Sequence, residues 1–342
     1  MSASKIEWTE RSDWNPVRGC TRVSPGCGGP GPHGGCYAEA IAGRFSDPGQ
    51  AFHGFATRTS AGGRWTGKVE VQWERLTLPL GWRKPAVIFA NSTSDIFHEA
   101  LRPEEIASIY AVAVAANHLR DHTTQLVTKR PERAAELLNS YAFWEQVNAE
   151  AGAHVMERTD PLNRRSDDAR ATLGDYDAAS PPPGVWIGVS VESQEWADKR
   201  REATRNIPAV VRFVSYEPAL GPVDWTGWEF VDQIIGGGES GPRARPMHPD
   251  WQRATRDWCA ANAVAYFFKQ WGDWEPSLDR DNDDPDWRAD YSNEFVDAGK
   301  SRWLNLSGGC GFHGERFHVM RRVGKRAAGR LLDGAQHDGV PV

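Results

Sequence analysis

A chain of 342 residues is long for one ordinary domain, although a barrel of repeated strand and helix units commonly fills such a length. Lysine and arginine number 40 against 46 aspartates and glutamates, and the formal net charge of −6 excludes a chain-wide basic field that attracts polyanions. The mean hydropathy of −0.59, with no long apolar run and no leader-like opening, favours a soluble cytoplasmic protein without a membrane partner.

Short apolar runs alternate with helical stretches along most of the chain. Helices are predicted over 103–117 and 131–138, each opening with a proline at its first position, and over 251–261. The alternation is typical of parallel strands that are buried on both faces. It predicts an α/β fold, a partial or full parallel (β/α) barrel in one elaborated domain spanning 1–342. The strands are predicted at 87–90, 125–127, 185–189, 210–214, 231–235 and 264–268.

Four segments look like additions to this framework. Residues 46–66 are glycine-rich, 157–184 end in three prolines, and 276–301 carry an acidic cluster, so we expect surface loops there. The fourth segment, 315–342, is predicted to be a basic C-terminal tail with a helix-compatible stretch.

Polar residues follow each predicted strand. In parallel barrels the carboxyl ends of the strands carry the functional groups, although polar side chains there can also simply cap a strand. We therefore expect a shared site at this edge. The residues at the strand ends are Ser94, Asp95, Lys129, Ser190, Glu192, Glu217, Glu239, Ser240, Lys269 and Gln270.

Three of the five cysteines crowd into 17 residues, with the spacing C-x6-C-x8-C for Cys20, Cys27 and Cys36. An odd count without a leader argues against a disulfide framework and favours a metal-ligand set. Two interpretations compete: a Cys3His zinc site completed by His33, and a [4Fe–4S] cluster held by three thiolates with one iron open. Cys259 is predicted to be a small buried residue, and Cys310 a loop thiol or a fourth ligand, of which we favour the loop.

The residues around these cysteines resemble the cluster loop of radical S-adenosylmethionine enzymes, especially the branch similar to spore photoproduct lyase. Asn15-Pro16-x-Arg18-Gly19-Cys20 looks like that branch's opening motif and Cys36-Tyr37-Ala38 like its exit. Phe89 to Asp95 looks like its strand ending in a Thr-Asp pair, Leu126 to Lys129 like its Thr-Lys strand end, and Gly188 to Glu192 like its serine-bearing strand.

The chain also resembles, over nearly its whole length, an uncharacterised phage-associated family with a three-cysteine motif. That family usually has a C-x6-C-x2-C loop, whereas this chain places eight residues between Cys27 and Cys36, which keeps the zinc interpretation open. The blocks that carry the likeness are Trp14 to Cys27, Asn91 to His98, Thr128 to Arg133, Arg212 to Asp224, Gly236 to His248, Phe268 to Trp274 and Gly324 to Gly334.

The first resemblance implies a radical-SAM type of barrel that binds a [4Fe–4S] cluster and S-adenosylmethionine, generates a 5′-deoxyadenosyl radical and takes electrons from a donor such as flavodoxin or ferredoxin. The cluster ligands would be Cys20, Cys27 and Cys36. By their positions at strand ends, we assign cofactor contacts to Asn91, Ser94, Asp95, Ser190 and Glu192, and catalytic roles to Lys129, Glu217, Glu239 and Lys269.

The expected substrate is a nucleic acid or a nucleotide, which the protein would modify or repair. It would act in the cytoplasm, which for a phage-encoded protein is the cytoplasm of the host cell. Aromatic residues and Arg130, Arg133, Arg243 and Arg245 support this expectation. The glycine-rich turn 236–241 could cradle phosphate but lacks the lysine of a P-loop. The basic residues of the tail are Arg316, Arg321, Arg322, Lys325, Arg326 and Arg330.

Two other functional classes stay open. A zinc-stabilised nucleic-acid-binding protein without catalysis would use the same cysteines and basic tail. A hydrolase on a barrel would use Glu217, Glu239 and Asp95 as acid and base.

Overall fold

The computed structural model describes residues 6–28, 35–60, 62–158, 173–281, 283–285, 300–309 and 316–341. The chain forms two compact units. The first unit comprises Met1–Arg22, Tyr37–Val189 and Glu202–Arg212, and the second comprises Val23–Cys36, Ser190–Arg201 and Phe213–Val342. The boundary therefore passes through the cysteine-rich segment.

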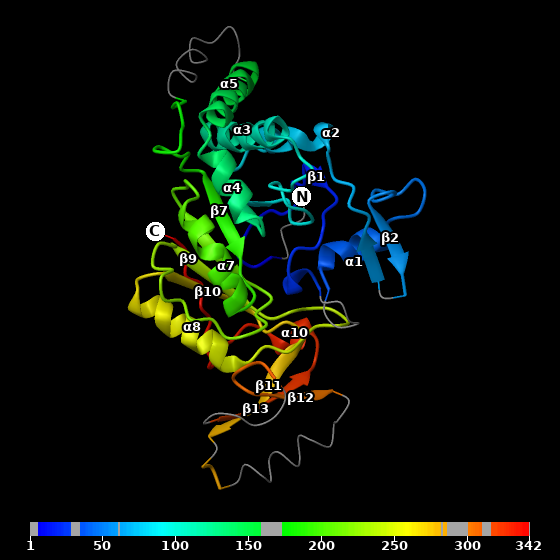
Figure 1. The fold of residues 1–342 in the computed structure, drawn as a ribbon, viewed down its shortest axis with the longest axis vertical. Helices are drawn as coiled ribbons and strands as arrows, with labels where there is room; N and C mark the ends of the chain where they lie inside the picture. The colour runs from blue at the N-terminus through cyan, green and yellow to red at the C-terminus, as the bar shows by residue number, and fades with distance from the viewer. Residues whose placement is uncertain are drawn as a thin grey trace. The chain divides into compact units, whose positions relative to one another are not determined.

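The first unit is built on three parallel strands, β5 (Val87–Ala90), β6 (Thr123–Thr128) and β7 (Val185–Ser190). The crossover between β5 and β6 is α3 (Pro103–Arg120), which is buried along residues 106–116, so its sequence is apolar on every side rather than amphipathic. The connection from β6 to β7 contains α4 and α5, and α5 packs along α3 (Figure 1). Their bounds are Pro131–Leu138 and Tyr141–Arg158.

Small elements before β5 complete the first unit. The helix α1 (Tyr37–Arg44) packs against a hairpin formed by β2 (Ala56–Thr59) and β3 (Gly62–Trp65). This hairpin lies in the segment 46–66, for which the sequence predicts a surface loop. A Cβ atom on Gly63 would lie 1.8 Å from the carbonyl oxygen of Glu39, so only glycine permits this close approach. The remaining elements are β1 (Val17–Arg18), β4 (Glu70–Val71), α2 (Trp73–Leu76) and η2 (Leu78–Gly81).

The second unit also contains three parallel strands, β8 (Arg212–Tyr216), β9 (Gln233–Gly237) and β10 (Ala265–Gln270). Its core is rich in aromatic rings, with Trp225 in edge contact with both Tyr216 and Trp228. Among its described residues, the second unit contains the helices η1 (Pro25–Cys27), α8 (Pro249–Ala261) and α10 (Lys325–Ala328), and α7 (Gln194–Arg205) crosses the unit boundary.

The expected basic tail begins with a strand, and its helix-compatible stretch forms a helix only over the short α10. β13 (Arg316–Arg322) is the central strand of an antiparallel sheet with β11 (Trp274–Asp281) and β12 (Ser301–Leu304). His318, Val319 and Met320 are buried there, which a solvated helix face would not require. Much of the predicted insertions 157–184 and 276–301 lies outside the described residues.

The parallel strands follow one another in the order β5-β6-β7-β8-β9-β10. This sequential order, with a helix in each crossover except the one from β8 to β9, is consistent with a partial β/α barrel, and the predicted mixed α/β class is confirmed. All six predicted strands overlap observed ones, and α4 has the predicted bounds. Among the helices that the structure describes, none is both long and apolar enough to span a membrane.

Candidate functional site

In the first unit, the segment that leads to Cys20 is fastened to the carboxyl end of β5. Asn91, at the strand end, accepts a hydrogen bond at Oδ1 from the Val17 amide at 3.2 Å. Ser94 donates from Oγ to the Val17 carbonyl at 2.9 Å. Asn15 accepts at Oδ1 from the amide and the hydroxyl of Thr93, both at 3.2 Å. The predicted cofactor residues Asn91 and Ser94 therefore position the segment that precedes the first cysteine.

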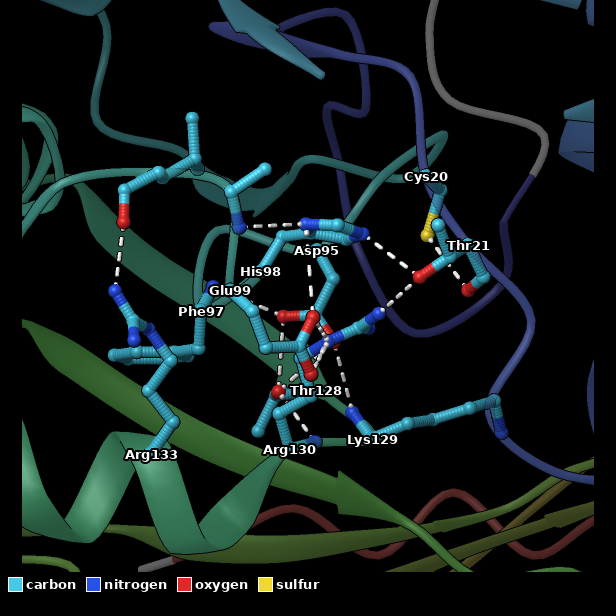
Figure 2. Close-up of polar contacts among 12 residues, drawn as sticks. Cys20, Thr21, Asp95, Phe97, His98, Glu99, Thr128, Lys129, Arg130 and Arg133 are labelled. Atoms are coloured by element: carbon cyan, nitrogen blue, oxygen red, sulfur yellow. Dashed lines mark hydrogen bonds and ion pairs between the residues drawn. The ribbon is translucent and has the colours of Figure 1, made fainter. Parts of the chain in front are cut away.

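Asp95 is the acceptor at the centre of this strand edge. Its carboxylate is buried and accepts from the Thr128 hydroxyl at 2.9 and 3.0 Å and from the backbone amides of Phe97 and Lys129, each at 3.0 Å. The guanidinium of Arg130 donates to Oδ2 at 3.1 Å. Asp95 thus joins the ends of β5 and β6, and in Figure 2 the Lys129 side chain extends away from this cluster.

Arg130 connects the same cluster to the residue after Cys20. Its Nε donates to both carboxylate oxygens of Glu99 at 2.8 Å, and its Nη2 donates to Thr21 Oγ1 at 2.8 Å (Figure 2). His98 Nδ1 accepts from the Ala100 amide, so the neutral ring carries its proton on Nε2 and donates it to Thr21 Oγ1 at 2.8 Å. With two donors already on its oxygen, the Thr21 hydroxyl proton is available to another group.

The electrostatics of the cluster follow from its burial. Burial, followed by the charge of Arg130, lowers the pKa of His98, which keeps the ring neutral. Burial acts to lower the pKa of Arg130 as well, but the negative charges of Asp95, Cys20 and Glu99 outweigh burial and raise it. Arg130 is therefore a fixed cation beside the first cysteine of the loop.

A further ion pair in the first unit joins the two ends of the cysteine segment. Arg22 Nη2 lies 2.5 Å from Glu39 Oε2, and Glu39, which is buried, also accepts from the Trp65 amide at 3.0 Å. In the sequence, Arg22 follows Cys20 by two residues and Glu39 follows Cys36 by three. The pair closes the segment that carries all three cysteines.

In the second unit, the interior of the cysteine segment is bound to Glu192, two residues beyond β7. Ser24 Oγ donates to Glu192 Oε1 at 2.5 Å, and Arg200 Nη1 donates to Oε2 at 2.9 Å. Both members of the Glu192–Arg200 pair are buried. The backbone at Gly26 passes so close that a Cβ atom there would lie 2.3 Å from Glu192 Oε1.

Glu239, two residues beyond β9, holds the segment at two further points. Its Oε1 accepts from the Gly35 amide at 3.2 Å. Arg245 donates to both oxygens of Glu239 at 2.8 Å and to the Pro25 carbonyl at 3.0 Å. Glu192 and Glu239, which we predicted as cofactor-binding and catalytic residues, therefore anchor the loop on both sides of Cys27.

A second polar group lies at the ends of β8 and β10. Lys269 Nζ and Gln270 Nε2 each donate to a different carboxylate oxygen of Glu217 at 2.8 Å. Among the described residues, Gln270 Oε1 and Ser240 Oγ are buried atoms without a hydrogen-bond partner, as is Asn91 Nδ2 in the first unit. A buried polar atom of this kind calls for a partner, which a water molecule, an ion or a bound ligand can supply.

The glycine-rich turn after β9 has a packing role. A Cβ atom on Gly238 would lie 2.0 Å from the Trp271 carbonyl oxygen, and one on Gly272 would lie 2.1 Å from that of Glu239. The glycines thus allow two backbone segments to touch, which a phosphate cradle does not need.

None of the cysteines that the structure describes, namely Cys20, Cys27, Cys36 and Cys259, forms a disulfide bond. Cys27 and Cys259 are buried, and burial raises the pKa of Cys259 to about 12, as suits the small buried residue that was predicted. His33 and Cys310 lie outside the described residues.

Several arginines predicted to attract an anionic substrate are paired within the protein. Arg321 and Arg322 bind Glu275 and Asp273, and Arg330 binds Asp338. Lys325 and Arg326 on α10 are exposed. The paired arginines contribute less to a basic surface than their number in the sequence suggested.

The sequence did not identify several side chains that organise the loop. Thr21, His98, Ser24 and Arg200 were not assigned roles, and Arg130 and Arg245 were assigned only to substrate charge. Ser24 and Glu192 are 168 residues apart in the chain, so no local pattern could pair them.

The chain is a mixed α/β protein in which the parallel strands follow sequence order and end in polar residues. The chain belongs to a family described as protein of unknown function, DUF5131, whose model matches residues 3–341. No curated protein and no solved structure matches the chain.

Proposed function

We propose that the protein is a radical S-adenosylmethionine enzyme whose [4Fe–4S] cluster is held by Cys20, Cys27 and Cys36. The observation that carries this proposal is the attachment of the cysteine segment to the carboxyl ends of strands. Thr21 is bound at the ends of β5 and β6 in the first unit, and Ser24 and Gly35 are bound beyond β7 and β9 in the second. Active sites of β/α barrels lie at this edge of the sheet.

The donor set suits the cluster. Three cysteines within 17 residues, none of them in a disulfide, match the thiolate ligands that iron–sulfur clusters prefer, and a three-cysteine set leaves one iron for a further ligand. Arg130 supplies a positive charge beside Cys20, which favours an anionic cluster over three protonated thiols.

The unpartnered polar atoms suit a bound cofactor and substrate. In the first unit, Asn91 Nδ2 can donate to a carboxylate or a ribose oxygen. In the second unit, Gln270 Oε1 can accept from an amino or hydroxyl group, and Glu217 holds the Gln270 amide in place. When bound, the reduced cluster supplies the electron that cleaves S-adenosylmethionine to methionine and a 5′-deoxyadenosyl radical.

The chain's own residues hold in place the loop that would carry the cluster. Glu192 and Glu239 fix the backbone on either side of Cys27, and Asp95 with Arg130 fixes the strand ends next to Thr21. Lys129, Glu217 and Lys269 remain the candidates to contact substrate. We propose a nucleic acid or a nucleotide as that substrate, on the likeness to the lyase branch and the exposed cations Lys325 and Arg326.

The test is anaerobic reconstitution of the full chain with iron and sulfide, followed by iron, labile sulfide and zinc analysis. The proposal expects four irons and four sulfides per chain. Both should be lost when Cys20, Cys27 and Cys36 are all replaced by alanine. Cys259→Ala is the matched control, because that thiol is buried in α8 and should leave the iron content unchanged.

Zinc bound through the three cysteines is the second candidate, favoured by the long Cys27 to Cys36 spacing and by His33 within it. A colourless protein with one zinc that depends on the three thiols, and with no iron after reconstitution, would support it and reject the enzyme. Mass analysis of candidate oligonucleotides incubated with the cluster-loaded protein, S-adenosylmethionine and a strong reductant then tests the substrate.

A further inference from the structure

A buried histidine pair in the second unit lies apart from the cysteine segment. His248, Asp250 and His318 each offer one ligand atom, and these atoms all lie within 4.8 Å of one another. His248 and Asp250 come from the start of α8, and His318 comes from β13. Both histidines are at most 1% exposed, and their ring centroids are 4.1 Å apart.

His318 is placed as a metal-binding histidine usually is. Its Nε2 lies 3.1 Å from Asp250 Oδ2, and its Nδ1 lies 3.2 Å from Asp279 Oδ1 on β11. Nδ1 is buried and forms no well-aligned hydrogen bond with any described residue. A histidine ligand typically points one ring nitrogen at the metal and gives the other N–H to a carboxylate, which is the role that Asp279 could take.

The charges around the pair leave room for a cation. Arg253 contacts three carboxylates, those of Asp250, Asp279 and Asp333, of which Asp333 is shared with Arg256. Arg256 also pairs with Asp257, so carboxylates outnumber guanidiniums around the two histidines, and this excess of negative charge favours a cation.

We propose that His248, Asp250 and His318 bind a zinc ion. Two imidazoles and one carboxylate are a donor set that zinc takes in open sites, where water fills the fourth position. The ion joins the start of α8 to the antiparallel sheet through His318. Zinc binding requires two hydrogen bonds to break: the one that His248 Nδ1 accepts from the Asp250 amide at 3.1 Å, and the one between His318 Nε2 and Asp250 Oδ2 at 3.1 Å.

The experiment uses the full chain stripped of metal with a chelator and titrated with Co²⁺ and, separately, with Zn²⁺. Cobalt held by nitrogen and oxygen gives visible d–d bands without the intense sulfur charge-transfer bands that cobalt on the cysteines would show. We expect one such ion per chain, and a rise in melting temperature when zinc is added.

His248→Asn is the decisive variant, because asparagine preserves a helix N-cap while it removes the imidazole. It should abolish the sulfur-free cobalt spectrum and the zinc-dependent rise in melting temperature. Asp279→Asn should weaken the affinity for cobalt about 10- to 100-fold. His118→Asn, near the end of α3 in the first unit, is the control that should bind as the wild type does.

The proposal is wrong if the wild type shows no sulfur-free cobalt band. It is also wrong if His248→Asn binds cobalt as tightly as the wild type does, since the three side chains would then form hydrogen bonds only. The proposal does not depend on the cysteine segment. The alanine variant of all three loop cysteines should therefore retain this site whether or not the protein binds iron.

Discussion

Replacement of Arg130 by methionine tests how the strand edge beside Cys20 is stabilised. Methionine keeps much of the buried side-chain volume but removes the only guanidinium that the structure shows in contact with the Asp95 carboxylate. Both side chains are about 5–7% exposed, so the carboxylate cannot be rehydrated without opening the strand ends.

The expected loss of stability depends on the hydrogen bonds that Asp95 keeps in the variant. Breaking a buried ion pair by removing one partner costs about 3–5 kcal/mol. Asp95 retains hydrogen bonds from the Thr128 hydroxyl and from the amides of Phe97 and Lys129, which favours the lower end of that range. Glu99 is 63% exposed and returns to water at little cost. We expect the free energy of unfolding to fall by about 3 kcal/mol.

The assay is urea unfolding at neutral pH, followed by circular dichroism, with all variants in the same metal-free state. Arg205→Met is the matched control, because Arg205 forms an exposed pair with Glu202 and its loss should change stability by less than about 0.5 kcal/mol. A loss below about 1 kcal/mol for Arg130→Met would show that Asp95 does not depend on the guanidinium, and would refute this reasoning.

Two further predictions concern other parts of the protein. Burial, with smaller contributions from Arg11 and Arg120, lowers the pKa of His122, so its stabilising effect is complete above the unfolded pKa of about 6.5 and declines as the pH falls below it. His122→Gln should make the free energy of unfolding less steep between about pH 6.5 and 5, by at most about 1.4 kcal/mol per pH unit, and an unchanged slope would contradict this. In the cysteine segment, Gly26→Ala should lower iron loading because its Cβ would lie 2.3 Å from Glu192 Oε1, whereas Gly35→Ala, with nothing within 4 Å, should load as the wild type does. Equal loading of the two variants, measured after reconstitution, would contradict the proposed role of Glu192.

The strands could be predicted because each is a short apolar run bounded by polar or glycine residues. Buried parallel strands produce that pattern locally, and α4 was found at its predicted bounds because Pro131 marks its first turn. β13 was missed because its basic residues hide the burial of Val319 and Met320, which depends on pairing with β11 and β12. The hairpin of β2 and β3 was missed because its glycines look like loop residues, whereas in the structure they allow close packing on α1.

The location of the candidate site was predictable from the sequence, but the hydrogen bonds and ion pairs within it were not. Polar strand ends pointed to Asp95, Glu192 and Glu239 without showing what each one binds. The partners come from distant parts of the chain, as when Gly35 donates to Glu239 from 204 residues away. A carboxylate at a strand end can bind a ligand only where the protein's own arginines do not already pair with it. The spacing of residues in the sequence does not show which carboxylates are paired.

The central claim is that Cys20, Cys27 and Cys36 hold a cluster with an iron open to S-adenosylmethionine. Electron paramagnetic resonance of the reconstituted, dithionite-reduced protein tests it most directly. We expect the signal of a reduced [4Fe–4S] cluster that changes when S-adenosylmethionine is added, because the cofactor would bind the open iron. A protein without that signal, or with a signal that the cofactor leaves unchanged, would contradict the proposal.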